Sequence, residues 1–95
     1  MPIRITVTLL VLAASSAYAD MDAPAAGKCV VLASQKGYED YRPKARALVN
    51  KARRSGDYEL LMLAEKKERK WLKEHPEEIF QLQWTREATK ACDKF

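Results

Sequence analysis

The sequence predicts an all-α protein, a small bundle of three or four helices built on an antiparallel helical hairpin and closed by one disulfide. Apolar side chains recur at spacings of three and four residues in the segments that would be helical, which is the period of an amphipathic helix. Glycine and proline fall where these segments would end or begin. Two cysteines, Cys29 and Cys92, lie near opposite ends of the helical region, so one bridge would tie its first helix to its last.

The first 19 residues have the pattern of a cleavable signal peptide. Arg4 provides a short positive region, and an apolar run follows it over residues 5–14. Small residues then form an A-x-A cleavage site at Ala17 and Ala19, just before Asp20. The apolar run is shorter than the about 20 residues that a membrane-spanning helix needs. We therefore expect export to the periplasm or the exterior, with no transmembrane segment in the mature chain.

Export would place Cys29 and Cys92 in an oxidising compartment, where they allow one intramolecular pair. In the chain-entropy model, a bridge across a loop of this length contributes about 4 kcal/mol to stability. A domain of this size has a marginal core, so a covalent staple is expected. There is no C-x-x-C redox motif, and two distant cysteines with the single histidine make a poor zinc site. The cysteines thus predict a structural disulfide and no metal site.

Residues 20–26 are expected to form a flexible leader, and residues 27–95 a single helical domain. The first helix would run from about Pro24 or Gly27 to Gln35. The sequence Cys-Val-Val-Leu within it also fits a short strand, but no second strand is evident to pair with it. Helix is therefore the favoured interpretation.

The second and third helices would form the hairpin. The second would start near Asp40 and end at Ser55-Gly56, where Gly56 supplies a left-handed residue. Its apolar stripe is the most regular in the chain and comprises Tyr38, Tyr41, Ala45, Leu48, Val49 and Ala52. Asp57 would cap the third helix, which runs to about Glu74. One face of the third helix would carry Leu60, Leu61, Ala64, Trp71 and Leu72. Because the connection is short, the two helices should lie antiparallel.

A fourth helix is predicted after His75. Pro76 suits the first helical position, and Glu77 and Glu78 suit the first turn, where the helix dipole favours negative charge. The apolar stripe of this helix would contain Phe80, Trp84, Ala88 and Ala91, with Phe95 as a further candidate. The alternation of apolar and polar residues over 80–84 also fits a strand, but both flanks favour a helix.

Basic residues of the two hairpin helices are expected to converge on one face. Each helix carries a basic row on the same rotational side of its apolar stripe, and an antiparallel arrangement brings the rows to one flank. The predicted binding face consists of Arg42, Arg46, Arg53, Lys66, Arg69 and Lys73. Such a face suits an anionic partner, whereas the simpler interpretation is a solvated flank with local pairs such as Glu65–Arg69. The mature chain has a net charge of only +3, one less than the +4 of the full sequence because Arg4 is removed. No nucleic-acid-binding motif accompanies this charge, so nucleic acid is not an expected partner.

Glu68 lies in the middle of the apolar face of the third helix, with Glu65 and His75 nearby. A carboxylate is costly to bury alone. Glu68 is therefore either a perturbed acid or base, as in a small hydrolase, or a carboxylate with a partner such as Lys28. The sequence has no nucleophile motif, phosphate-binding loop or metal-binding motif to support catalysis. We expect neither an enzyme nor a cofactor.

Four apolar side chains fall outside the main stripes of their helices, and they are Met62, Leu63, Ile79 and Leu82. Either the first helix covers them in a wider core, or they form a surface for a partner or for a second copy of the chain. Both interpretations stay open at the level of the sequence.

The segment Glu68-Arg69-Lys70-Trp71-Leu72 resembles the Gln-Arg-x-Trp-Leu segment of small periplasmic lysozyme-inhibitor-like domains, which are also helical and disulfide-bonded. The likeness spans one or two helical turns. Cys92 lies well beyond the position of the final cysteine in that pattern, and the remaining cysteines are missing, so no family membership follows.

These features together predict a small exported, non-enzymatic protein that docks a protein partner, as an inhibitor, an immunity factor or a chaperone-like factor does. The alternative is an electrostatic binder of an anionic envelope polymer or of lipid head groups through the basic face. Binding to a polymer would weaken steeply as salt rises, whereas an apolar contact between proteins would persist. The sequence is also compatible with a homodimer.

Overall fold

The computed structural model describes residues 21–95, which contain α-helices, one short 3-10 helix and no strand. The predicted signal peptide and its cleavage site lie outside these residues. The all-helical prediction is confirmed for the described part, and the strand alternatives are wrong. The elements are α2 (Ala23–Ala33), η1 (Glu39–Tyr41), α3 (Arg42–Ser55), α4 (Tyr58–Glu74) and α5 (Glu78–Asp93). No helix in this part of the chain is both long and apolar enough to cross a membrane.

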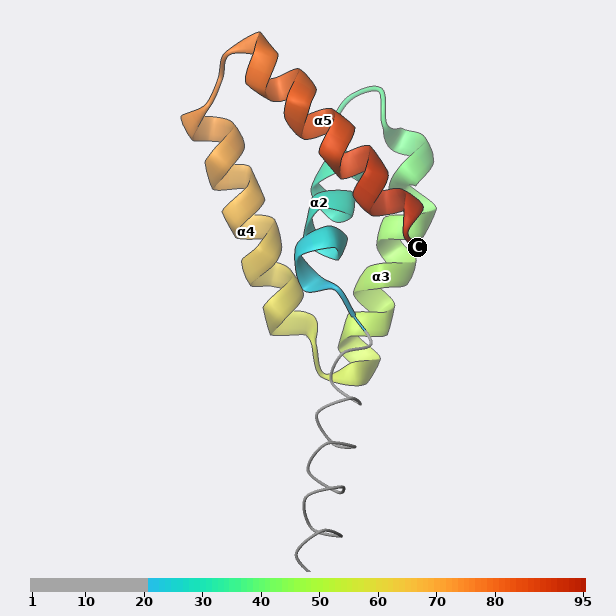
Figure 1. Cartoon of the computed structure of the whole chain (residues 1–95). Coiled ribbons are helices and arrows are strands. Elements are labelled where there is room, and N and C mark those ends of the chain that lie inside the picture. Colours follow the sequence, from blue (N-terminus) through green and yellow to red (C-terminus); the bar gives the residue numbers. More distant parts are fainter. Residues whose placement is uncertain (1–20) are drawn as a thin grey trace, which may run out of the picture.

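The core is built around α2, which is the shortest of the four α-helices within residues 21–95. α2 lies between α3 and α4, and α5 crosses it (Figure 1). Ala26, Cys29 and Leu32 on α2 are completely buried. A helix that is apolar around nearly its whole circumference is stable in water only when neighbouring elements cover it. The central position of α2 follows from this composition.

The hairpin of α3 and α4 is present but does not organise the bundle as predicted. Gly56 connects the two helices with a φ of 83°, and the N–H of Asp57 donates to the carbonyl of Ala52 at 2.8 Å. From this turn the two helices diverge, and α2 fills the space between them (Figure 1). Each of them packs more extensively on α2 than on the other. The predicted direct packing of the hairpin is therefore wrong in part.

The segment predicted as a flexible leader contributes the first turn of α2. An oxygen of the Asp22 carboxylate accepts the N–H of Ala25 at 3.2 Å, which caps the helix at Ala23. Ala25 and Ala26 are buried. The reason is local, because alanine has the highest helix propensity and its small side chain lets α2 approach its neighbours closely.

A disulfide joins Cys29 of α2 to Cys92 of α5, with the Cα atoms 4.8 Å apart, as predicted. Both cysteines are completely buried. Beside the bridge, the Lys44 side chain of α3 donates to the carbonyl oxygen of Cys92 at 3.0 Å. The bridge therefore fastens α5 across the central helix, and Lys44 connects the same point to α3.

Two predicted helix starts differ in detail. Asp57 is the N-cap residue of α4, but its carboxylate accepts the Ser55 hydroxyl at 3.0 Å and caps no backbone N–H. α5 begins at Glu78, so Pro76 precedes the helix instead of occupying its first position. The side chain of Gln81 closes the corner between α4 and α5 by donating to the last carbonyls of α4 and its cap, those of Leu72 and His75, at 3.2 and 2.7 Å.

Candidate functional site

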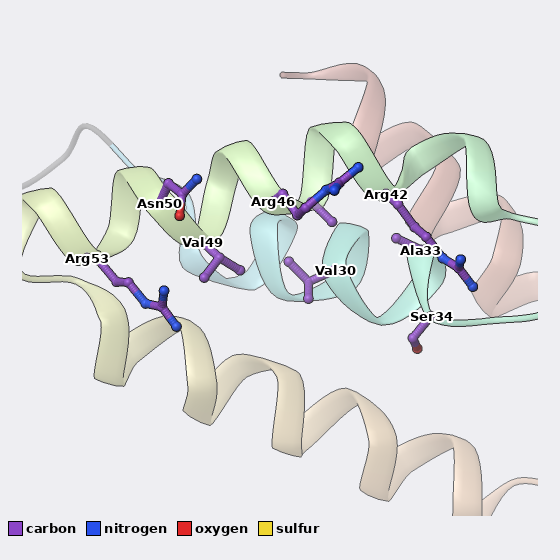
Figure 2. Close-up of a pocket in the computed structure, with 9 residues that line it drawn as sticks. Val30, Ala33, Ser34, Arg42, Arg46, Val49, Asn50 and Arg53 are labelled. Atoms are coloured by element: carbon purple, nitrogen blue, oxygen red, sulfur yellow. The ribbon is translucent and has the colours of Figure 1, made fainter.

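An open groove of about 720 Å³ runs along the boundary between α2 and α3 (Figure 2). It exists because α3, α4 and α5 cover α2 on three sides and leave the fourth side open. The groove is lined by Val30, Ala33 and Ser34 of α2 and by Arg42, Ala45, Arg46, Val49, Asn50 and Arg53 of α3. The α3 residues are spaced three, one, three, one and three apart, so they form one face of that helix.

The floor of the groove is apolar and its rim is basic. Ala33 and Ala45 are buried, and Val30 and Val49 are half-buried. These two valines lie next to each other between the helices in Figure 2. The three arginines of α3 are exposed. Arg42 and Arg53 extend from α3 toward α4, whereas Arg46 extends along α3 (Figure 2). We call Arg42, Arg46 and Arg53 the arginine rim.

No carboxylate within residues 21–95 forms an ion pair with the arginine rim. Arg53 lies over the Tyr58 ring, 5.0 Å from its centroid, a cation–π contact at the Gly56 end of the groove. At the other end Glu39 is near Arg42, but its carboxylate accepts the N–H of Gly37 at 3.1 Å. Backbone N–H groups, of Glu39 itself and of Gly37, lower the pKa of Glu39, and Arg42 adds a smaller effect. The rim thus keeps its positive charge available to an outside group.

The α4 half of the predicted basic face is only partly joined to this site. Arg69 reaches the edge of the groove, where its guanidinium donates to the Ser34 hydroxyl at 3.4 Å. Lys66 and Lys73 are exposed and do not line the groove. Of the six predicted basic residues, three line the groove, one touches its edge and two lie outside it.

The buried carboxylate of α4 is Glu65 and not Glu68. Glu68 reaches the ammonium of Lys28 at 2.8 Å, and Lys28 is one of the partners that the sequence allowed. Glu65 is 6% exposed, and burial raises its pKa, while the Arg69 guanidinium at 3.8 Å acts in the opposite direction. The sequence placed Glu65 beside the apolar face because that face was defined by the apolar residues of α4 alone. The true partner, α2, contacts a face rotated toward Leu61 and Glu65.

His75 forms no hydrogen bond or ion pair with Glu65 or Glu68. Its Nδ1 lies 2.8 Å from the carbonyl oxygen of Trp71, and its ring stacks on the Trp71 ring with the centroids 4.2 Å apart. The edge of Phe80 completes this aromatic cluster. The structure therefore does not bring the predicted acid–base residues together. Within residues 21–95 no group of three or more His, Cys, Asp or Glu side chains is placed to hold a metal ion.

The four apolar side chains outside the predicted stripes are all exposed, so α2 does not cover them. Their exposed fractions are 38% for Met62, 63% for Leu63, 71% for Ile79 and 56% for Leu82. Leu60, which was predicted to be buried, is 57% exposed. Leu63 is separated from the end of α4 by about 16 Å of helix, whereas Ile79 and Leu82 follow that end. These residues therefore do not form one continuous surface.

The sequence matches no protein-family model, and neither a curated protein nor a solved structure is significantly similar to this chain. The function is therefore inferred from the residues of the groove and its rim.

Proposed function

We propose that this protein is a small, exported, non-enzymatic binding protein that docks a protein partner in the groove between α2 and α3, as an inhibitor, an immunity factor or a chaperone-like factor does. The observation that supports this proposal is the uncovered side of α2. There an apolar floor that includes Val30 and Val49 is bordered by the arginine rim.

The composition of the groove resembles that of a protein–protein interface. Such interfaces have an apolar centre and a polar rim, and arginine is enriched in them relative to the rest of the surface. A small-molecule site usually encloses most of its ligand, whereas this groove is open along its length (Figure 2). The packing of α2 on α3, and the hydrogen bond from Lys44 of α3 to Cys92 beside the disulfide, connect the two walls before binding. A preorganised surface of this kind loses little conformational entropy when a partner docks.

The alternative function is electrostatic binding of an anionic envelope polymer or of lipid head groups. It is favoured by the arginine rim, which has no carboxylate partner within residues 21–95, and by the exposed Lys66 and Lys73 of α4. Such binding depends on exposed charges, so it should weaken steeply between low and physiological salt. Docking on the apolar floor should persist, because salt does not screen an apolar contact.

A charge placed on the floor tests the proposal. We expect Val49→Glu to abolish capture of a partner from an envelope extract by the immobilised, oxidised protein at physiological salt. Leu63→Glu is the matched control, since it introduces the same side chain at an exposed position of α4 outside the groove. Equal capture by the wild-type protein and by Val49→Glu would contradict docking in the groove. Capture lost only with Leu63→Glu would place the contact on α4.

The export part of the proposal has its own test. Mass spectrometry of the exported protein should show a chain that begins at Asp20, as the A-x-A pattern predicts. An intact Met1 in the exported pool would refute it.

A further inference from the structure

We propose that the segment docked in the groove is an acidic amphipathic α-helix of the partner, lying along α3 and covering the open side of α2. This inference rests on the proposed docking function and specifies what the groove recognises. It is drawn from the shape of the floor, from the arrangement of the rim and from the absence of backbone partners in the groove.

The floor favours a helix over an extended peptide. A docked strand needs a sheet edge whose N–H and C=O groups complete its hydrogen bonds. Residues 21–95 contain no strand, and the groove is lined by two helices whose backbone groups are already paired within each helix. A segment on this apolar floor must therefore satisfy its own backbone, as an α-helix does.

The size of the floor side chains fits the close approach of a helix. Ala33 and Ala45 are small, and Val30 and Val49 lie at the level of the surface between them. Packed helices approach to an axial distance of roughly 8–10 Å, and small side chains at the contact allow the shorter values. An added helix would give α2 a fourth neighbour and so complete the covering of an apolar helix.

The rim specifies the charge and spacing of the partner. Arg42, Arg46 and Arg53 are four and seven residues apart, so they follow one face of α3 over about 16 Å, or three turns. None of them is paired with a carboxylate in residues 21–95. A helix nearly parallel or antiparallel to α3 would meet them with carboxylates at the same spacings, beside a stripe of apolar residues. Arginine is well suited to this contact because its guanidinium binds a carboxylate through two parallel hydrogen bonds.

A pair of synthetic peptides tests this inference. The first is an alanine-rich helix of about 20 residues, long enough to fold in isolation, with glutamates spaced to match the arginine rim and leucines on the adjacent face. The second has the same composition, shuffled so that its glutamates and leucines share no face. Fluorescence anisotropy at physiological salt should show the patterned peptide binding at least about tenfold more tightly, which is the difference expected for one well-made charged contact. The methyl resonances of Val30 and Val49 should shift on binding.

Charge reversal in the rim provides the second arm. Arg46→Glu should weaken binding of the patterned peptide by about tenfold or more. A peptide with lysine in place of the one glutamate that faces position 46 should restore the affinity. Lys66→Glu is the control, because it makes the same change of charge at an exposed position outside the groove. Circular dichroism of each variant confirms that its helices are retained.

The possible outcomes separate this inference from the proposed function. Equal affinity for the patterned and shuffled peptides, or equal losses from Arg46→Glu and Lys66→Glu, would overturn the helix inference. Suppose that the patterned peptide fails to bind while Val49→Glu still abolishes partner capture. In that case docking stands and the helical partner is wrong. Binding of phosphatidylglycerol vesicles that Arg46→Glu removes, with no binding of either peptide and with partner capture unchanged by Val49→Glu, would overturn both in favour of the electrostatic alternative.

Discussion

Replacing Gly27 with alanine tests the close packing at the centre of the bundle. A Cβ on Gly27 would lie 2.7 Å from the Ala64 Cβ, 3.0 Å from the Ala64 carbonyl carbon and 3.1 Å from the Glu65 nitrogen. Carbon atoms in favourable contact are about 3.5–4.0 Å apart. Two of the three neighbours are backbone atoms of α4, so no change of rotamer relieves the contact. The mutant must separate α2 from α4.

The sign of the stability change depends on two opposing effects. Alanine favours a helix interior over glycine by about 1 kcal/mol. Overpacking a well-filled core costs roughly 1–3 kcal/mol. We expect the packing cost to win, with a net loss of about 1 kcal/mol for Gly27→Ala. A larger loss of about 3 kcal/mol is expected for Gly27→Val, because two more methyl groups must be accommodated. For a domain of this length, 1 kcal/mol corresponds to roughly 4–8 °C in Tm.

Urea unfolding followed by tryptophan fluorescence measures these changes. A double-mutant cycle provides the control, because Ala64→Gly removes the atom at 2.7 Å while the two backbone contacts remain. The combined Gly27→Ala and Ala64→Gly variant should lose less stability than the two single variants together. If Gly27→Ala is as stable as the wild type or more stable, the helices are not in close contact at this position and the reasoning is refuted.

Three further predictions concern the bridge, the turn and the buried carboxylate. Reduction of the disulfide, which spans 63 residues, should lower the unfolding free energy by about 4 kcal/mol, and an unchanged Tm would show that the bridge adds no stability. Gly56→Val should cost about 1–2 kcal/mol in thermal unfolding, since Gly56 has a φ of 83°, and a neutral result would contradict the left-handed turn. Burial raises the pKa of Glu65 above its ordinary value of 4.5, so the folded state binds this proton more tightly than the unfolded state. Protonated Glu65 stabilises the fold fully at pH values below the pKa of this carboxyl in the unfolded chain. This stabilisation is lost as the pH rises through the higher pKa of the carboxyl in the folded protein. The unfolding free energy of Glu65→Gln should therefore exceed that of the wild type by most at pH 7, and by progressively less as the pH falls through the folded pKa of Glu65. The opposite trend in urea unfolding would refute the burial of this carboxylate.

The helices and their ends were largely predictable because their signals are local. The apolar period, Gly56 and the break at Pro76 act on neighbouring residues only, and they place α3, α4 and α5 to within a few residues. The disulfide was predictable for a different reason, since Cys29 and Cys92 have no other intramolecular partner. α2 was mistaken in part because its alanine-rich start resembles a leader in composition.

The candidate site was only half predictable. Arg42, Arg46 and Arg53 share one face of a helix in any fold, and the sequence predicted them as a binding face. The apolar floor was missed, because Val30 borders the groove only where the other helices leave that side of α2 open. Burial of Glu65 and exposure of Leu60 were missed for the same reason, namely that the inner face of α4 depends on its partner.

By itself the sequence determined that the described chain is helical, where each helix turns back and which two sulfur atoms join. The helices and turns depend on local backbone conformations, and the disulfide follows because Cys29 and Cys92 are the only two cysteines in the sequence. Only the tertiary structure decided which helix is central and which of its sides remains open. Several helices here carry apolar faces of similar strength, and the choice among them depends on how closely backbones can approach. The small residues Gly27 and Ala64 allow α2 and α4 to pack closely. The apolar periodicity of the sequence does not predict this contact between two separate helices.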